Sequence, residues 1–456
     1  MYLTARTDDV NTAEKYYKNE NDILRKENPL EEKVKKTDNP LRSADNRISH
    51  PFHQLLVNQK AAYAMTVPPS FDVDDKDLND EIVKLLGDTY AKTAKDLCIN
   101  ASNAGIAWLH IWRDEKYQNF FRYAVVDSKQ IIPVYSKKLS HKLEGILRIY
   151  EDYDEEGDVI VIYEYWNDVE CSSFFRKKRG TIEDLEVFNS FLEVDIATGD
   201  IVGDTNRYVH GWNEIPFIPF RNNPTEQSDL DLYKRLIDVY DKVFSGFVND
   251  VDDIQEIIFV LTNYGGEDKA EFLKDLKQYK MIKIDADNED AKSGVDTLAI
   301  DIPVEARAKI LELTRESIFT LGQGVDPQKN IGQNNSGAAL KYMYSLLELK
   351  ASMLETEFRV GFAELVRFIL SYSNSDADVT IKQTWTRSAI NNDLEQAEIV
   401  STLANVTSQE NIAKSNPIVE DWETELANLK SELDNDMRAE DDYKDDYKDV
   451  KEDGEA

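Results

Sequence analysis

Cysteine is scarce in this sequence: Cys98 and Cys171 are the only two among 456 residues. Two cysteines allow one disulfide at most, so a disulfide-built scaffold is excluded and a reducing compartment is expected. Neither cysteine belongs to a Cys-x-x-Cys pair. We therefore expect each to be a small, buried, apolar side chain.

Long apolar runs are missing as well. No stretch approaches the roughly 18 apolar residues that a membrane-spanning helix needs. The first 20 residues are polar and lack the apolar segment of a signal peptide. The sequence therefore predicts a soluble protein that is made in the cytosol and does not enter a membrane.

Basic residues are in the minority, and the formal charge is −34. Proteins that hold nucleic acid tightly do so with Lys and Arg, which displace the counterions of phosphate groups. The charge argues against such a protein, but it is compatible with one that DNA slides past. The simplest interpretation is a solvated acidic surface.

Signatures of catalysis are absent too. There is no Gly-x-x-x-x-Gly-Lys-Ser/Thr phosphate loop, which argues against an ATP-driven motor. His50 and His53 are spaced as metal ligands could be, but no Cys or acidic ligand set accompanies them. The Asp-rich segments 72–80 and 285–296 lack the central Gly of a calcium loop. We expect no catalytic residues, no cofactor and no bound metal.

The sequence does contain enough apolar residues, 41%, for two or more packed modules. Its first 60 residues are charged, and we expect them to be loosely structured at their start. Hydrophobic periodicity predicts helices over 50–65 and most of 78–107, then an antiparallel sheet over 122–219. Within that sheet, the turn at 154–157 predicts a hairpin.

From residue 228 onward the pattern becomes helical. Apolar residues spaced three or four apart from Leu236 to Leu261 predict one long amphipathic helix that ends at residues 263–266. A small insert follows, with a helix over 269–278 and strands over 280–284 and 295–302. Later helices are predicted over 303–321 and 338–370, a strand over 379–385, and an acidic helical region from residue 395.

Several blocks of residues, in order along the chain, resemble those of one family. The clearest are residues 228–241 (SDLDLYKRLIDVYD), together with Gly211-Trp212 and residues 215–220 (IPFIPF). Others are Tyr16-Tyr17, residues 21–23 and 46–50, Gln59-Lys60, Tyr63, and residues 337–340 and 346–351. Together they resemble the portal proteins of tailed bacteriophages, especially siphophages of Gram-positive hosts.

The resemblance implies an α+β, predominantly helical fold of the portal type, with wing, stem, clip and crown regions. Matched by order, the regions are an N-terminal wing of helices and antiparallel strands (1–227), stem helices (228–260 and 304–322), a small α/β clip (261–303), a tunnel loop (323–336), a long channel or wing helix (337–370), a wing strand (371–392), crown helices (393–430) and an acidic disordered tail (431–456).

The tunnel loop holds the predicted site residues, which would face DNA: Gln328, Lys329, Asn330, Gln333, Asn334 and Asn335. Mostly neutral donors with a single lysine suit transient contact with a passing backbone, without sequence specificity. The alternative interpretation is an ordinary flexible linker between two helices.

The resemblance also implies a function. The chain would be a non-enzymatic head-tail connector subunit in a dodecameric ring at one capsid vertex, forming the channel for DNA packaging and ejection. Its partners would be terminase, the head-completion adaptor, the major capsid and scaffolding proteins, and double-stranded DNA. It would be found in the virion, and in the host cytoplasm during assembly. The alternatives are a metal-dependent phage nuclease using the Asp-rich loops, and a minor head or adaptor protein of different symmetry.

Overall fold

A computed structural model shows a mixed α+β fold in which helices predominate, as the sequence predicted. The chain divides into two compact units, Met1–Gly324 with Lys350–Thr386, and Val325–Leu349 with Arg387–Ala456. The structure describes residues 2–25, 44–114, 120–139, 141–194, 201–254, 258–262, 294–298, 303–328, 337–388, 401–402, 407–415, 422 and 424–431.

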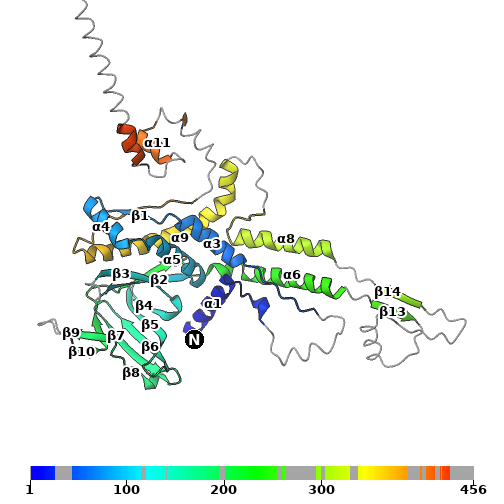
Figure 1. The fold of residues 1–456 in the computed structure, drawn as a ribbon, viewed down its shortest axis with the longest axis horizontal. Coiled ribbons are helices and arrows are strands. Elements are labelled where there is room, and N and C mark those ends of the chain that lie inside the picture. The colour runs from blue at the N-terminus through cyan, green and yellow to red at the C-terminus, as the bar shows by residue number, and fades with distance from the viewer. Residues whose placement is uncertain are drawn as a thin grey trace, which may run out of the picture. The chain divides into compact units, whose positions relative to one another are not determined.

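In the first unit, helices lie along one side of the sheets, and others extend away from them (Figure 1). Among the described residues, no helix is long and apolar enough to cross a membrane. Within the described ranges the α-helices are α1 (Tyr2–Tyr17), α3 (Phe52–Met65), α4 (Lys76–Leu86), α5 (Tyr90–Ala104), α6 (Lys234–Ile254), α8 (Val304–Leu321), α9 (Gly337–Tyr372) and α11 (Gln409–Ser415). Short 3-10 turns are η1 (Asp22–Leu24), η3 (Ser128–Gln130), η4 (Ile182–Asp184) and η5 (Asp229–Leu232).

Two antiparallel sheets carry most of the strands. The smaller has the order β12-β2-β3, built from Phe217–Arg221, Ile106–Asp114 and Phe120–Val126. The larger has the order β11-β7-β6-β5-β4, with β8 also paired to β7. Its strands are β4 (Ile131–Tyr135), β5 (Leu143–Tyr153), β6 (Val159–Trp166), β7 (Glu170–Lys177), β8 (Glu186–Val187) and β11 (Arg207–Val209).

The remaining strands form two-stranded pairs, each antiparallel: β1 (Ser70–Asp72) with β15 (Lys382–Thr384), β9 (Phe191–Val194) with β10 (Ile201–Thr205), and β13 (Ile258–Thr262) with β14 (Gly294–Leu298). The predicted hairpin is confirmed, since β5 pairs with β6 across residues 154–158. The strand predicted over 379–385 is confirmed as β15.

The start of the chain differs from the prediction. It is helical from Tyr2, and α1 buries Val10, Ala13 and Tyr16 on one side. Ala13 and Tyr16 join a core with residues of α3 and α8, the start of α6 and the turn before it: Phe52, Leu56, Leu230, Tyr233, Ile237, Ile318 and Phe319. Three apolar residues, spaced three apart on one side of α1, are therefore enough to pack a helix whose other residues are mostly polar.

The first long helix is shorter than predicted. It was expected to continue to Leu261, but α6 ends at Ile254 and residues 258–262 form strand β13. The apolar run Ile-Phe-Val-Leu continues the helical spacing by coincidence, and its composition suits a strand equally well. The strand predicted over 295–302 appears as β14, which ends at Leu298.

The helices predicted over 303–321 and 338–370 are confirmed as α8 and α9. The second unit contains the first part of α9, where Leu347 is buried, and α11, where Ala413 is buried. The predicted helix over 269–278, the strand over 280–284, residues 285–293 of the Asp-rich loop and residues 432–456 of the acidic tail lie outside the described residues.

Candidate functional site

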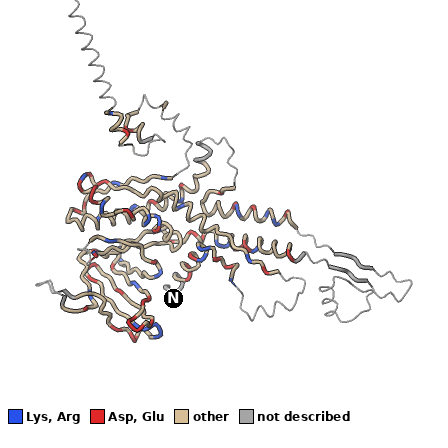
Figure 2. The backbone as a smooth tube through the Cα atoms, viewed as in Figure 1, with Lys and Arg blue, Asp and Glu red and all other residues tan. Residues whose placement is uncertain are grey.

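Helices α6 and α8 lie side by side and form a long helical pair (Figure 1). On the inner side of α8, Thr314, Ile318 and Phe319 are buried. Arg307 of α8 pairs with Asp250 of α6 and lies over the ring of Phe247. Figure 2 shows that the last turns of α6 are acidic. The pair is therefore held by an apolar contact between the start of α6 and the end of α8, and by an ion pair near the end of α6.

A second apolar stripe runs along an adjoining, exposed side of α8. Ile310, Leu313 and Leu321 are 45%, 49% and 53% exposed. With Ala306 and Ser317 they recur every three or four residues, so they share one face of the helix. We call these five residues the outer α8 stripe. An apolar stripe of this length on a helix already packed on its other side indicates a second partner.

One side of α6 is occupied by an extended segment, residues 44–50, which we call the strap. Its alternate backbone N–H groups donate to side chains one turn apart along the helix. His50 N donates to Asp241 Oδ1 at 3.1 Å, Ile48 N to Ser245 Oγ at 3.0 Å and Asn46 N to Asn249 Oδ1 at 2.6 Å. The strap therefore covers the polar side of α6.

With α8 on one side and the strap on another, one side of α6 stays open among the residues that the structure describes. It consists of Arg235, Val239, Lys242 and Gly246, spaced by three or four residues. Val239 is 44% exposed, and a Cβ added at Gly246 would meet no atom within 4 Å. The side is nearly flat at Gly246, where another helix could approach closely. We call these four residues the open α6 face.

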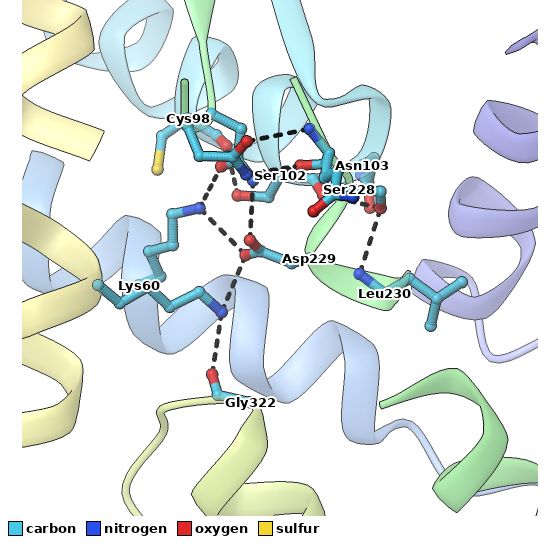
Figure 3. A network of polar contacts seen from close by, with 12 residues as sticks. Lys60, Cys98, Ser102, Asn103, Ser228, Asp229, Leu230 and Gly322 are labelled. Atoms are coloured by element: carbon cyan, nitrogen blue, oxygen red, sulfur yellow. Dashed lines mark hydrogen bonds and ion pairs between the residues drawn. The ribbon is translucent and has the colours of Figure 1, made fainter. Parts of the chain in front are cut away.

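Just before α6, three buried charges meet (Figure 3). Asp229 Oδ2 accepts from Lys60 Nζ and from Lys350 Nζ, each at 3.0 Å. All three side chains are almost fully buried. The Asn222 amide joins them, accepting from Lys60 and donating to Asp229 Oδ1 at 2.9 Å. We call this group the lysine junction.

Burial alone would raise the pKa of Asp229, but the two ammonium groups and the Asn222 amide hold it below its usual range. Burial lowers the pKa of Lys350, and the nearby Asp229 carboxylate opposes this effect. The junction links four parts of the chain: α3 through Lys60, the segment before α6 through Asp229, α9 through Lys350, and the end of α8 through Gly322.

The end of α8 is a tight turn. Gly324 N donates to Phe319 O at 2.9 Å and Gln323 N to Thr320 O at 3.2 Å, the pattern of a Schellman motif. The residue in the left-handed conformation is Gln323, with φ 54°. The carbonyl of Gly322 accepts from Lys350 Nζ at 3.0 Å. The first residues of the predicted tunnel loop are thereby tied to the lysine junction.

Of the predicted DNA-facing residues, only Gln328 is described. It is exposed, and its N–H donates to Asp326 Oδ1 at 2.9 Å within a turn. Lys329, Asn330, Gln333, Asn334 and Asn335 lie outside the described residues. Their role stays a prediction.

The lysine junction was not predicted from the sequence, although the sequence carries a signal for it. Lys60 lies on the same face of α3 as the buried Leu56 and Ala64. Lys350 likewise lies on the same face of α9 as the buried Leu347 and Leu354. A lysine within an apolar stripe of a helix needs a buried carboxylate partner, because an unpaired buried charge is costly.

The residues weighed as metal ligands have structural contacts instead. His50 hydrogen-bonds Asp241, while His53 lies between the Tyr233 hydroxyl and Asn103. Asp75 caps α4 by accepting from the N–H groups of Asp77 and Leu78. Within the described ranges, no group of three or more His, Cys, Asp or Glu side chains could hold a metal ion.

The two cysteines are buried, and neither forms a disulfide, as expected. Burial raises the pKa of the Cys98 thiol to about 11 and that of Cys171 still further. Thiols of this kind are unreactive, because the thiolate is the nucleophile.

Comparison with known proteins supplies the family. The family described as phage portal protein, SPP1 Gp6-like, matches residues 3–439. A portal protein of Clostridium phage phiCD119 is 40% identical over 92% of this chain and 91% of its own length. The portal protein of Bacillus phage SPP1 is 31% identical over 92% of this chain and 82% of its own length.

Among solved structures, a chain from the neck of an empty GTA particle has a TM-score of 0.42 at 13% identity, covering 81% of this chain and 90% of that one. The chain belongs to the SPP1 Gp6-like family of phage portal proteins, structural and non-enzymatic proteins that form rings and make up the head-tail connector at a capsid vertex.

Proposed function

We propose that copies of this chain form their ring by packing the outer α8 stripe of one subunit against the open α6 face of the next. The observation that carries this proposal is the exposed row of Ile310, Leu313 and Leu321 on a helix whose other side is already buried. Burying three large apolar side chains in each subunit contact is favourable by roughly 1.5–3 kcal/mol per fully buried side chain.

The two surfaces suit a ring because they are different and lie on neighbouring helices. A closed ring uses a heterologous contact, in which each subunit offers one patch to one neighbour and another patch to the other. The apolar α8 stripe and the open face around Gly246 provide such a pair. Gly246 has no side chain, so the neighbouring helix could approach closely there.

The regions of the subunit follow from this arrangement. We assign α6 and α8 to the stem, the segment between them to the clip, and the sheets with α1, α3, α4 and α5 to the wing. The stem helix then ends at Ile254 instead of residue 260. Residues 323–336 would be the tunnel loop, and the C-terminal region after residue 392 would be the crown.

The partners follow from the role of a connector. We expect a dodecamer that passes double-stranded DNA without reading its sequence, with Gln328, Lys329, Asn330, Gln333, Asn334 and Asn335 facing the channel. The net charge of −34 supports a channel that repels phosphate and so does not trap DNA. The clip would dock terminase and later the head-completion adaptor, and the wing would contact capsid and scaffolding proteins.

The test is ring formation by the purified chain, measured by native mass spectrometry and negative-stain imaging. We expect twelve copies in the wild-type ring. Leu313→Glu should leave a folded subunit that no longer forms rings, because it places a charge in the proposed contact. The control is Glu312→Lys, which changes the neighbouring exposed position on a different side of α8 and should still give rings. Normal rings from Leu313→Glu would mean that the subunits meet elsewhere.

A further inference from the structure

The lysine junction has an unequal number of charges. One buried carboxylate, Asp229, faces two buried ammonium groups, Lys60 and Lys350. A single lysine would balance the carboxylate, and burying a second ammonium costs free energy unless other groups solvate it. The contacts of the two lysines beyond Asp229 therefore show what each one adds.

The two lysines differ in one contact. Lys60 donates to the side-chain oxygen of Asn222, which is itself held by Gln227 O and Asp229. Lys350 donates to the backbone carbonyl of Gly322 at the end of α8. That carbonyl lies at the negative end of the helix dipole, where a cation is favoured. Of the two lysines, Lys350 is the one that hydrogen-bonds both Asp229 and the turn before the tunnel loop.

The turn at the end of α8 has little room to move independently. A Cβ at Gly324 would lie 2.2 Å from the Leu56 side chain, and one at Gly322 would lie 2.6 Å from it. Leu56 belongs to α3, the helix that also carries Lys60. The turn is thus packed against α3 on one side and hydrogen-bonded to Lys350 on the other.

We propose that Lys350 is a positioning residue that fixes the base of the tunnel loop relative to the start of the stem helix. Its ammonium joins Asp229, which precedes α6, to Gly322, which precedes the loop. A displacement at the start of α6 is transmitted to the first loop residues through this side chain, beside the packing of Leu56 of α3 against the turn. The functional consequence rests on the proposed function, in which residues 323–336 face DNA in the channel.

The chain offers a matched pair of variants to test this. Lys350→Met and Lys60→Met each remove one ammonium and leave a balanced pair with Asp229. Each also leaves one neutral oxygen without its donor, on Gly322 in the first case and on Asn222 in the second. The two variants therefore remove the same charge from the junction. They differ in whether the turn loses the hydrogen bond to the carbonyl of Gly322.

The direct readout is hydrogen exchange of the Gly322, Gln323 and Gly324 amides in assembled rings. We expect these amides to exchange at least tenfold faster in Lys350→Met than in Lys60→Met, with rings intact in both. Equal exchange in the two variants would overturn the positioning role. If Lys350→Met does not fold, Lys350→Gln, which keeps a polar end without the charge, is compared with Lys60→Gln in the same way.

A second readout separates this inference from the function on which it rests. DNA packaging into procapsids should fall several-fold in Lys350→Met relative to Lys60→Met. Faster exchange at the turn with equal packaging would support Lys350 as the positioning residue but contradict the DNA-facing role of residues 323–336. Equal exchange with unequal packaging would overturn the inference and leave the role of the loop intact.

Discussion

The carboxylate of Asp241 accepts two hydrogen bonds from His50, one from its backbone N–H at 3.1 Å and one from its ring Nδ1 at 2.7 Å. Asn21 Nδ2 donates to the other carboxylate oxygen at 2.7 Å. Asp241 is fully buried in α6. One side chain therefore anchors the strap and the segment after α1 to the stem helix.

Asp241→Ala should be strongly destabilising, because three donors lose their acceptor in a buried place. We expect a loss of roughly 3 kcal/mol in the free energy of unfolding. Chemical denaturation at a fixed protein concentration measures it, since ring formation also affects apparent stability. The control is Asp252→Ala at the exposed end of the strap, where Asn46 Nδ2 donates to the carboxylate. That change should cost less than about 0.5 kcal/mol, and similar losses in both variants would contradict the anchoring role of Asp241.

Two glycines inside helices should respond oppositely to replacement by alanine. A Cβ at Gly361 in α9 would lie 2.7 Å from the ring of Phe220, which is packed against Phe358 and Phe362. We expect Gly361→Ala to cost about 1–3 kcal/mol through overpacking. In the separate subunit, where its Cβ meets open space, Gly246→Ala in α6 should gain up to about 1 kcal/mol from helix propensity. Urea midpoints of the two variants check this, and stabilisation by both would show that the Phe220 ring can move aside.

The stability of the fold should fall as the pH drops below about 6.5, the ordinary pKa of histidine. Burial lowers the pKa of His53 to about 4 and that of His110 to about 3. Between pH 6.5 and pH 4, these two histidines are therefore protonated in the unfolded chain but stay neutral in the folded one. Each histidine contributes a loss of about 1.4 kcal/mol per pH unit across that window.

The measurement is the difference in urea midpoint between pH 7.5 and pH 5, because other groups also titrate in this range. His110→Gln should be less stable at pH 7.5, since it disturbs the contact with Pro216 O, but its stability should fall less on acidification. The control His141→Gln changes an exposed histidine and should keep the wild-type slope. An unchanged slope in His110→Gln would show that His110 is not held neutral in the folded protein.

The sequence predicted the elements that are buried on one side only, because burial of one side produces a regular spacing of apolar residues. Helices α8 and α9 and the β5–β6 hairpin fall where the apolar spacing placed them. Strand β2 was missed because its residues 106–109 and 111 are all buried, so the run lacks the alternation of a half-buried strand. Its position directly after a helix also made it appear to be the end of that helix.

The outer α8 stripe and the lysine junction were harder to predict from the sequence than the fold. The outer α8 stripe makes α8 apolar on two sides, and counting apolar residues along one helix does not separate the side packed on α6 from the exposed one. The lysine junction joins residues from positions 60, 229 and 350. Such pairing depends on tertiary packing, which local patterns do not encode.

The left-handed residue at the end of α8 gives a final prediction about the base of the tunnel loop. Gln323 has φ 54°, a conformation that its Cβ disfavours and that glycine adopts freely. Gln323→Gly should therefore stabilise the turn by about 1 kcal/mol. The increase appears as a higher urea midpoint and as slower hydrogen exchange of the Gly324 amide, which donates to Phe319 O.

Gln323→Ala is the matched control, because it removes the glutamine side chain but keeps a Cβ in the same backbone conformation. It should leave stability unchanged or slightly reduced. Equal stabilisation by Gly and Ala would mean that the glutamine side chain, and not the backbone, is the source of the cost. If Gln323→Gly is the more stable variant, the glutamine fits a turn that has to change conformation when DNA passes. Packaging by Gln323→Gly tests this, and we expect it to be slower than packaging by the wild type.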